Sequence, residues 1–137
     1  MILTLHILSV ISAFIVVAYA DHYGLGWIRG VTQTLDEKKL RVLHATTWGT
    51  LVLVLITGGT LFYNDYESLL ASSAFILKMS FVGALIVNAL GIGFLMKIST
   101  KSKFATLSIN DKISLFVAGG TSTLCWVGAL ISAFFIY

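Results

Sequence analysis

The sequence contains no proline among its 137 residues. Proline removes a backbone donor and interrupts helices, so its absence favours long, uninterrupted helices. The chain has one cysteine, Cys125, which excludes an internal disulfide and any zinc or iron–sulfur site built from cysteines. Charge is also scarce, because 11% of the residues are charged and 58% are hydrophobic. A soluble domain of this size cannot bury so much apolar surface, so we expect the chain to lie in a lipid bilayer.

Four apolar runs are long enough to cross a bilayer core, which takes about 20 helical residues. They cover residues 2–20, 42–63, 73–96 and 113–137. The first run has no basic start and no small-residue cleavage motif, so we interpret it as a retained helix rather than a signal peptide. Because the runs use nearly the whole chain, we predict an all-α integral membrane protein, with residues 1–137 forming one up-and-down four-helix bundle.

Basic residues are unevenly distributed between the loops. Those that flank the first and third loops are Arg29, Lys38, Lys39, Arg41, Lys97, Lys101, Lys103 and Lys112. The second loop has Asp65 and Glu67 and no base. The positive-inside rule therefore predicts cytoplasmic first and third loops and extracytoplasmic termini, in a bacterial-type inner membrane. The net charge of +3 reflects this loop bias and does not indicate nucleic-acid binding.

Lys78 is the one charged residue inside an apolar run. A cation at membrane depth costs roughly 2.5–3.5 kcal/mol on insertion scales, which makes Lys78 a candidate catalytic residue. Asn88 lies on the same run, and steps of three and four residues through Phe81 and Leu85 place both polar residues on one helix face. No acidic residue lies inside any run, which argues against a proton-coupled transporter or a cation exchanger.

His6 shares a stripe with small residues such as Ser9 and Ala13, so we expect it to face the bundle. His6 and Lys78 each lie about five residues from the outer surface, or about 7–8 Å at 1.5 Å per residue. We therefore predict a pair of nitrogen donors at one level, which serve as metal ligands or substrate-side groups. The alternatives are that His6 lies in the headgroup zone and that Lys78 extends outward along its flexible stem.

His44 and Trp48 share a seam near the cytoplasmic side of the second run. This pair forms either the edge of a cofactor pocket or an interfacial belt, and the sequence leaves both interpretations open. His22 is interpreted as a solvated loop histidine, although His22 and His44 offer an alternative pair of metal ligands.

The fourth run carries a seam of small residues. Its members are Ser114, Ala118, Thr121, Cys125, Gly128 and Ser132. Such a seam predicts close helix packing, or a slot for a flat molecule, and it leaves room for a homodimer. Trp126 lies beside this seam at mid-membrane, where its indole N–H needs a partner.

Three short segments carry a resemblance to a known family. The segment Phe75–Val82 with Asn88, the segment Leu5–Ile7, and the segment Lys38–Arg41 resemble helices of the HemJ-type protoporphyrinogen oxidases. Copper-resistance CopD-like membrane domains are similar to about the same degree. The HemJ resemblance implies a small four-helix haem b membrane protein in which a histidine and a lysine are essential, here His6 and Lys78.

Histidines, a buried lysine and tryptophans suit a porphyrin better than a bare ion, and four-helix bundles commonly hold haem between facing histidines. The first hypothesis is therefore a membrane haem b oxidoreductase that oxidises a porphyrinogen or passes electrons to a quinone. Its cofactor-binding residues would be His6, Lys78, His44, Trp48 and Asn88. The second hypothesis is a non-enzymatic membrane scaffold or a metal-handling protein of the CopD kind.

Overall fold

The computed structural model describes residues 1–136, and these residues are almost entirely helical. The elements are α1 (Ile2–Ile28), α2 (Glu37–Asn64), α3 (Tyr66–Ala71), α4 (Ser73–Lys101), the 3-10 turn η1 (Phe104–Thr106) and α5 (Ile109–Ala133). Helices α1, α2, α4 and α5 are long and apolar enough to cross a membrane. The predicted all-α membrane protein with four long helices is confirmed.

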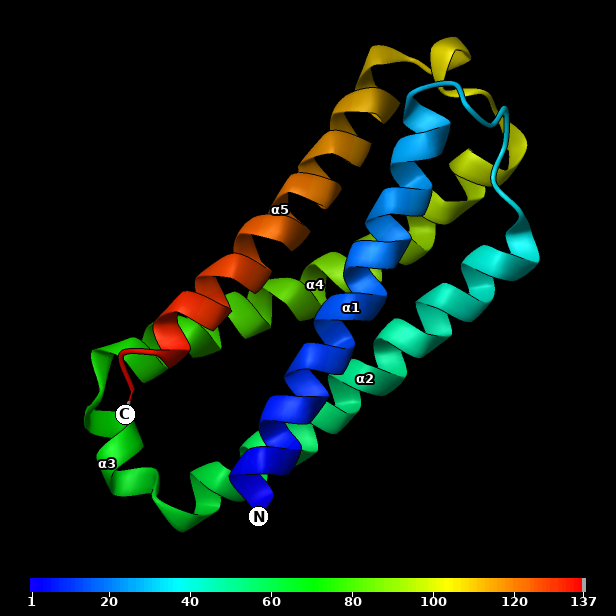
Figure 1. The fold of residues 1–137 in the computed structure, drawn as a ribbon. Helices are drawn as coiled ribbons and strands as arrows, with labels where there is room; N and C mark the ends of the chain where they lie inside the picture. Colours follow the sequence, from blue (N-terminus) through cyan, green and yellow to red (C-terminus); the bar gives the residue numbers. More distant parts are fainter. Residues whose placement is uncertain (137) are drawn as a thin grey trace.

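The four long helices run alternately up and down, and α5 ends at the end of the bundle at which α1 begins (Figure 1). Helix α1 packs along α2, and α4 packs along α5, so the bundle consists of two helical hairpins. Contacts between the two hairpins are sparser, with α2 against α4 as the main backbone approach. Because the two hairpins lie farther apart than the helices within each hairpin, side chains rather than close backbone contacts fill the centre of the bundle.

Polar side chains define where three of the helices begin. The carboxylate of Asp36 accepts a hydrogen bond from the backbone N–H of Lys39 at 3.1 Å. The hydroxyl groups of Ser72 and Ser108 cap α4 and α5 in the same way. Such caps satisfy backbone donors that the first turn of a helix leaves free. They fix the helix starts at the interface, where the apolar runs alone give no sharp boundary.

The helices are longer at the basic end than the apolar runs indicated. Helix α1 continues past the predicted boundary at residue 20 to Ile28, because Trp27 is 2% exposed and donates its Nε1–H to the carbonyl oxygen of Ser102 at 3.0 Å. Helix α4 extends to Lys101, and α5 begins at Ile109, ahead of the predicted residue 113. The predicted end of the fourth run at residue 137 lies outside the described residues.

The core is small and lies where the two hairpins face each other. It consists of Ala13, Val17, Val54, Leu85, Cys125 and Trp126. Large apolar side chains elsewhere point outward, as with Phe94 at 79% exposed and Leu124 at 71% exposed. Outward apolar surface on this scale has no favourable solvent except lipid, which supports a location in the bilayer.

The buried stripe of α5 differs in part from the predicted seam. Its small residues are Ala118, Ser122, Cys125, Ala129 and Ser132. Ser114 is exposed and Thr121 is half-buried, so the prediction was wrong at these two positions. Small residues stand at both Thr121 and Ser122, and spacing alone could not decide which of them faces α4. Gly128 does contact α4, because a Cβ placed there would lie 2.5 Å from the Phe81 ring.

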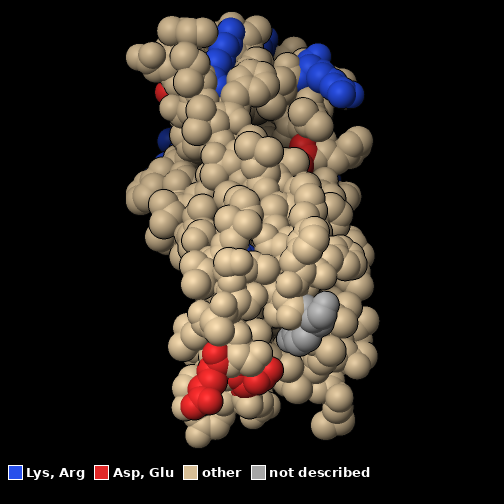
Figure 2. All heavy atoms as spheres, turned by 90° about the vertical axis from the view of Figure 1, so that its left-hand side faces the viewer, with Lys and Arg blue, Asp and Glu red and all other residues tan. Residues whose placement is uncertain are grey.

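Charged side chains are separated along the long axis of the molecule. In Figure 2, lysine and arginine side chains gather at the upper end and acidic side chains form a patch at the lower end. The long middle section presents almost no charged atoms on the face shown. This distribution is typical of a protein with a lipid-facing belt between two aqueous ends.

Candidate functional site

His6 is buried between α1 and α2, with 8% of its surface exposed. Its Nδ1 lies 2.9 Å from the hydroxyl oxygen of Thr57. The Thr57 hydroxyl also lies within hydrogen-bonding distance of the backbone carbonyl oxygens of Leu53 at 2.9 Å and Val54 at 3.2 Å. The tautomer of His6 decides whether the ring nitrogen donates to the hydroxyl or accepts from it.

Gly58 makes room for the His6 ring at the helix contact. A Cβ at Gly58 would lie 3.1 Å from Cε1 of His6. Lys78 on α4 is half-buried. Within residues 1–136, no carboxylate forms a salt bridge with Lys78. His6 near the start of α1 and Lys78 near the start of α4 both lie toward the acidic end of the bundle, which we call the His6–Lys78 region.

His44 and Trp48 form a second pair, one helical turn apart on α2. The indole Nε1–H of Trp48 donates to Nε2 of His44 at 3.2 Å, and the rings meet edge to face at a centroid distance of 6.4 Å. Indole is only a donor, so Nε2 of His44 must be unprotonated and Nδ1 must carry the proton. The hydrogen bond uses the lone pair through which His44 would ligate a metal, and it leaves the Nδ1–H as a donor.

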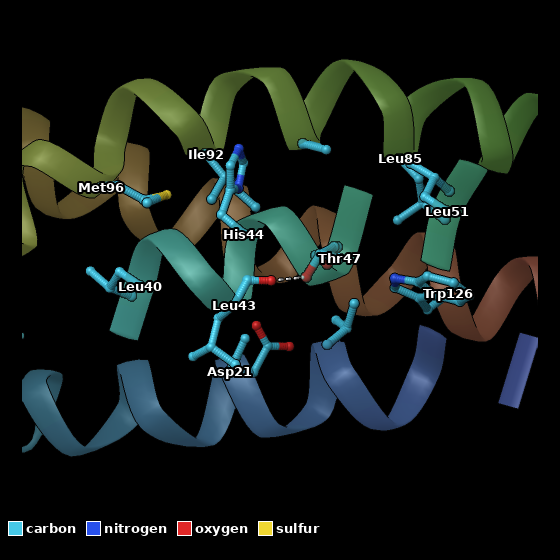
Figure 3. A pocket seen from close by; sticks show the side chains of 14 residues that line it. Asp21, Leu40, Leu43, His44, Thr47, Leu51, Leu85, Ile92, Met96 and Trp126 are labelled. Atoms are coloured by element: carbon cyan, nitrogen blue, oxygen red, sulfur yellow. Dashed lines mark hydrogen bonds between the residues drawn. The ribbon is translucent and has the colours of Figure 1, made fainter. Parts of the chain in front are cut away.

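A cavity of about 160 Å³ lies between α1, α2, α4 and α5, and His44 lines it. Figure 3 shows His44 reaching from α2 toward α4, between Ile92 and Met96. Leu51, Leu85 and other apolar side chains form most of the wall, and open space continues from the cavity to the surface. The cavity lies nearer the basic end of the bundle, so it is distinct from the His6–Lys78 region.

Four polar side chains besides His44 line this cavity, and they belong to Asp21, Thr47, Ser122 and Trp126. The Asp21 carboxylate reaches from α1 toward α2 (Figure 3) and lies at the rim, because Asp21 is exposed overall. The Thr47 hydroxyl lines the wall and donates to the carbonyl of Leu43 at 2.9 Å, which leaves its oxygen as an acceptor. Trp126 of α5 forms the wall toward the middle of the bundle, and its indole nitrogen points into the cavity (Figure 3).

The indole N–H of Trp126 differs from those of the other two tryptophans. Trp27 and Trp48 both donate hydrogen bonds to protein acceptors. Trp126 is 6% exposed, yet its Nε1–H meets no acceptor among residues 1–136 and remains accessible from the cavity. Tryptophan N–H groups usually find a partner when they are buried. The cavity therefore has two ring N–H donors without protein partners, one from Trp126 and one from His44.

Asn88 and His22 take other places in the structure. The side-chain amide of Asn88 donates to the backbone carbonyl of Ala118 at 2.9 Å and so ties α4 to α5. Asn88 does not line the cavity, although its neighbour Ala89 does. His22 is exposed on the last turns of α1 and is also absent from the cavity wall. The alternative ligand pair of His22 and His44 therefore shares no cavity.

Comparisons with known proteins give no family for this chain. No protein-family model matches it, and no curated protein or solved structure matches it significantly. The resemblance to HemJ-type oxidases and CopD-like domains is therefore not supported by a family match.

The cavity beside His44 is too small for haem b, whereas the predicted haem ligands His6 and Lys78 lie outside its wall. Cavities that hold drug-sized ligands measure roughly 300–1,000 Å³, and a porphyrin is at least as large as such ligands. The cavity of about 160 Å³ is well below that range. In addition, Nε2 of His44 is already engaged by Trp48. The cavity at His44 therefore does not support a haem site, and haem at His6 and Lys78 stays a prediction.

The predicted metal ligands His6 and Lys78 stay a prediction, because a lysine is not among the residue types that define a cluster of metal ligands here. Within residues 1–136, no three His, Cys, Asp or Glu side chains come together in a way that could hold a metal ion. Sequence reasoning identified His6, Lys78, His44 and Trp48, and it noted the unmet N–H of Trp126. It did not find Asp21 or Thr47, because their relevance depends on the cavity between the hairpins.

Proposed function

We propose that this protein is an integral membrane protein that binds the ring of a lipid-soluble quinone-class compound between its two helical hairpins. The observation that carries the proposal is the pair of ring N–H donors, from Trp126 and His44, that face an apolar cavity without protein acceptors. A quinone ring carries two carbonyl oxygens, which are acceptors and have no proton to donate. Its chemistry complements a site with two free donors.

The size of the cavity supports a ligand with one ring. An apolar cavity of about 150 Å³ is large enough to hold benzene. The cavity of about 160 Å³ therefore accommodates a single six-membered ring but not a fused or macrocyclic system. Because open space continues from the cavity to the surface, an isoprenoid tail has a route out toward the lipid.

The hydrogen-bonding energetics favour an occupied site. A ligand acceptor that takes a hydrogen bond from an accessible N–H of the cavity contributes about 0.5–1.5 kcal/mol. The reduced ring, a quinol, has hydroxyl protons to donate, and the Thr47 oxygen and the Asp21 carboxylate offer acceptors at the wall and rim. The site thus has complementary partners for both oxidation states of the ring, which supports a role in quinone-linked electron transfer.

The orientation in the membrane forms part of the proposal. The basic end, which carries the α1–α2 and α4–α5 connections, faces the cytoplasm, and the α2–α4 connection faces the outside. The uneven distribution of charge between the two ends supports this assignment (Figure 2). The proposed ring site would then lie in the cytoplasmic half of the membrane.

The experiment that tests the proposal is calorimetric titration of decylubiquinone into the purified protein in lipid nanodiscs. We expect saturable binding, and we expect Trp126→Phe to weaken it by about 2- to 13-fold, since one hydrogen bond contributes about 0.5–1.5 kcal/mol. Trp27→Phe is the matched control and should bind like the parent, because Trp27 lies outside the cavity wall. Absence of binding, or a haem Soret band in the visible spectrum of the purified protein, would overturn the proposal.

A further inference from the structure

A second hollow lies at the basic end of the bundle, outside the membrane-spanning core. It has a volume of about 290 Å³. Its wall comes from the α1–α2 connection on one side and from the α4–α5 connection on the other. The residues that matter here are Trp27, Arg29, Thr32, Gln33, Lys103 and Phe104.

Specific contacts hold the two sides of this hollow together. The Nε1–H of Trp27 donates to the Ser102 carbonyl at 3.0 Å, and the Trp27 and Phe104 rings meet edge to face at 5.3 Å. The backbone N–H of Leu35 donates to the Ser99 carbonyl at 2.9 Å. The hollow is therefore built by contacts between segments that are distant in the sequence.

The charge of the hollow has one sign. Arg29 and Lys103 line it, and no acidic residue does. Within residues 1–136, neither cation forms a salt bridge with a carboxylate. Lys112 adds positive charge beside the hollow, because its ammonium lies 5.4 Å from the centre of the Phe104 ring. Thr32 and Gln33 supply neutral polar groups at the same wall.

We propose that this hollow binds the phosphate of an anionic phospholipid headgroup from the leaflet that surrounds the basic end. A planar guanidinium matches phosphate through paired hydrogen bonds, and a lysine ammonium adds a point charge. Clusters of basic residues at a membrane surface attract anionic lipids. The half-buried Phe104 ring, held by the buried Trp27, gives the glycerol region an aromatic surface, which free phosphate would not use. The combination of cations and aromatic rings at a membrane boundary therefore favours a lipid as the ligand.

The test is native mass spectrometry of the full-length protein in detergent, titrated with phosphatidylglycerol or phosphatidylcholine. We expect at least a fivefold preference for phosphatidylglycerol in the parent protein. The double variant Arg29→Gln/Lys103→Gln should lose that preference. The control Lys38→Gln/Lys97→Gln removes the same charge from two exposed positions at the same end of the bundle, neither of which lines the hollow. Its affinity for phosphatidylglycerol should differ from that of the parent by less than twofold.

Three results would overturn this inference. The first is equal affinity of the parent protein for the two lipids. The second is an equal loss in both double variants, which would indicate a diffuse charge effect without a built site. The third is displacement of phosphatidylglycerol by millimolar inorganic phosphate, which would indicate a free-phosphate site. All four positions are exposed, so far-ultraviolet circular dichroism should show the same helix content in every variant.

Discussion

Nδ1 of His6 lies 2.9 Å from the hydroxyl oxygen of Thr57, and this buried side-chain hydrogen bond joins α1 to α2. The Thr57 hydroxyl also lies 2.9 Å from the carbonyl oxygen of Leu53 on its own helix. These contacts position the imidazole ring over Gly58. The contact explains why a polar residue is buried so close to the start of the chain.

Replacement of Thr57 by valine keeps the shape of the side chain and removes the hydrogen-bond partner of His6. We expect the free energy of unfolding to fall by about 0.6 kcal/mol, the average for hydrogen bonds between membrane helices, and by no more than about 1.7 kcal/mol. The measurement is thermal unfolding in detergent, followed by circular dichroism. Thr60→Val is the matched control, because Thr60 is exposed on the same helix and bonds only to the backbone of Ile56. Equal melting temperatures for the two variants would contradict the role of Thr57.

Replacement of Gly128 by alanine tests the contact between α4 and α5. A Cβ at Gly128 would lie 2.5 Å from the Phe81 ring, so the ring or a helix must move, and overpacking typically costs about 1–3 kcal/mol. Gly120→Ala is the control, because Gly120 lies on the same helix with no atom within 4 Å of the added carbon. We expect a lower melting temperature for Gly128→Ala alone. A drop of the same size in the melting temperature of Gly120→Ala would contradict the close contact of Gly128 with Phe81.

Replacement of Lys78 by methionine tests whether the quinone binds in the cavity beside His44 or in the His6–Lys78 region. Methionine keeps most of the bulk and removes a half-buried charge, so the variant should insert and fold at least as well as the parent. Its affinity for decylubiquinone should not change, because Lys78 does not line the cavity. Lys78→Arg retains the charge and should not gain stability. Loss of quinone affinity in Lys78→Met would place the ligand in the His6–Lys78 region instead.

Cysteine labelling tests the orientation in the membrane. In a Cys125→Ala background, a cysteine placed at Asn64, in the acidic connection, should react with a membrane-impermeant thiol reagent in intact bacterial cells. A cysteine placed at Lys103, in the basic connection, should react only after lysis. The reverse pattern would invert the orientation and place the ring site in the outer half of the membrane.

The sequence allowed the four helices and much of their inward faces to be predicted. Small residues at helical spacing identified the buried positions Ser9 and Ala13 on α1, because only small residues let helices approach closely in lipid. The end of α1 was missed, since the first apolar run ends at residue 20. The contact of Trp27 with Ser102, which stabilises those last turns, comes from a distant part of the chain.

The candidate site could be predicted only in part. The hydrogen-bonding needs of Trp126 follow from its chemistry, and the pairing of His44 with Trp48 follows from their spacing on one helix. The cavity itself depends on how far apart the two hairpins lie, and no local pattern encodes that distance. The haem prediction rested on residue types and a resemblance, neither of which gives the size of the space between the helices.

The central claim is that the cavity between the hairpins holds the ring of a quinone. Ala89 lines this cavity, so Ala89→Leu should fill it, and Ala45→Leu adds the same bulk at an exposed position of α2 that is not part of the wall. The most direct measurement is the dissociation constant of decylubiquinone for both variants in nanodiscs, with the melting temperature as a check on folding. We predict at least a tenfold weaker affinity for Ala89→Leu, with a melting temperature no lower than that of the parent, and parental affinity for Ala45→Leu. Parental affinity in a folded Ala89→Leu variant would contradict the proposed site.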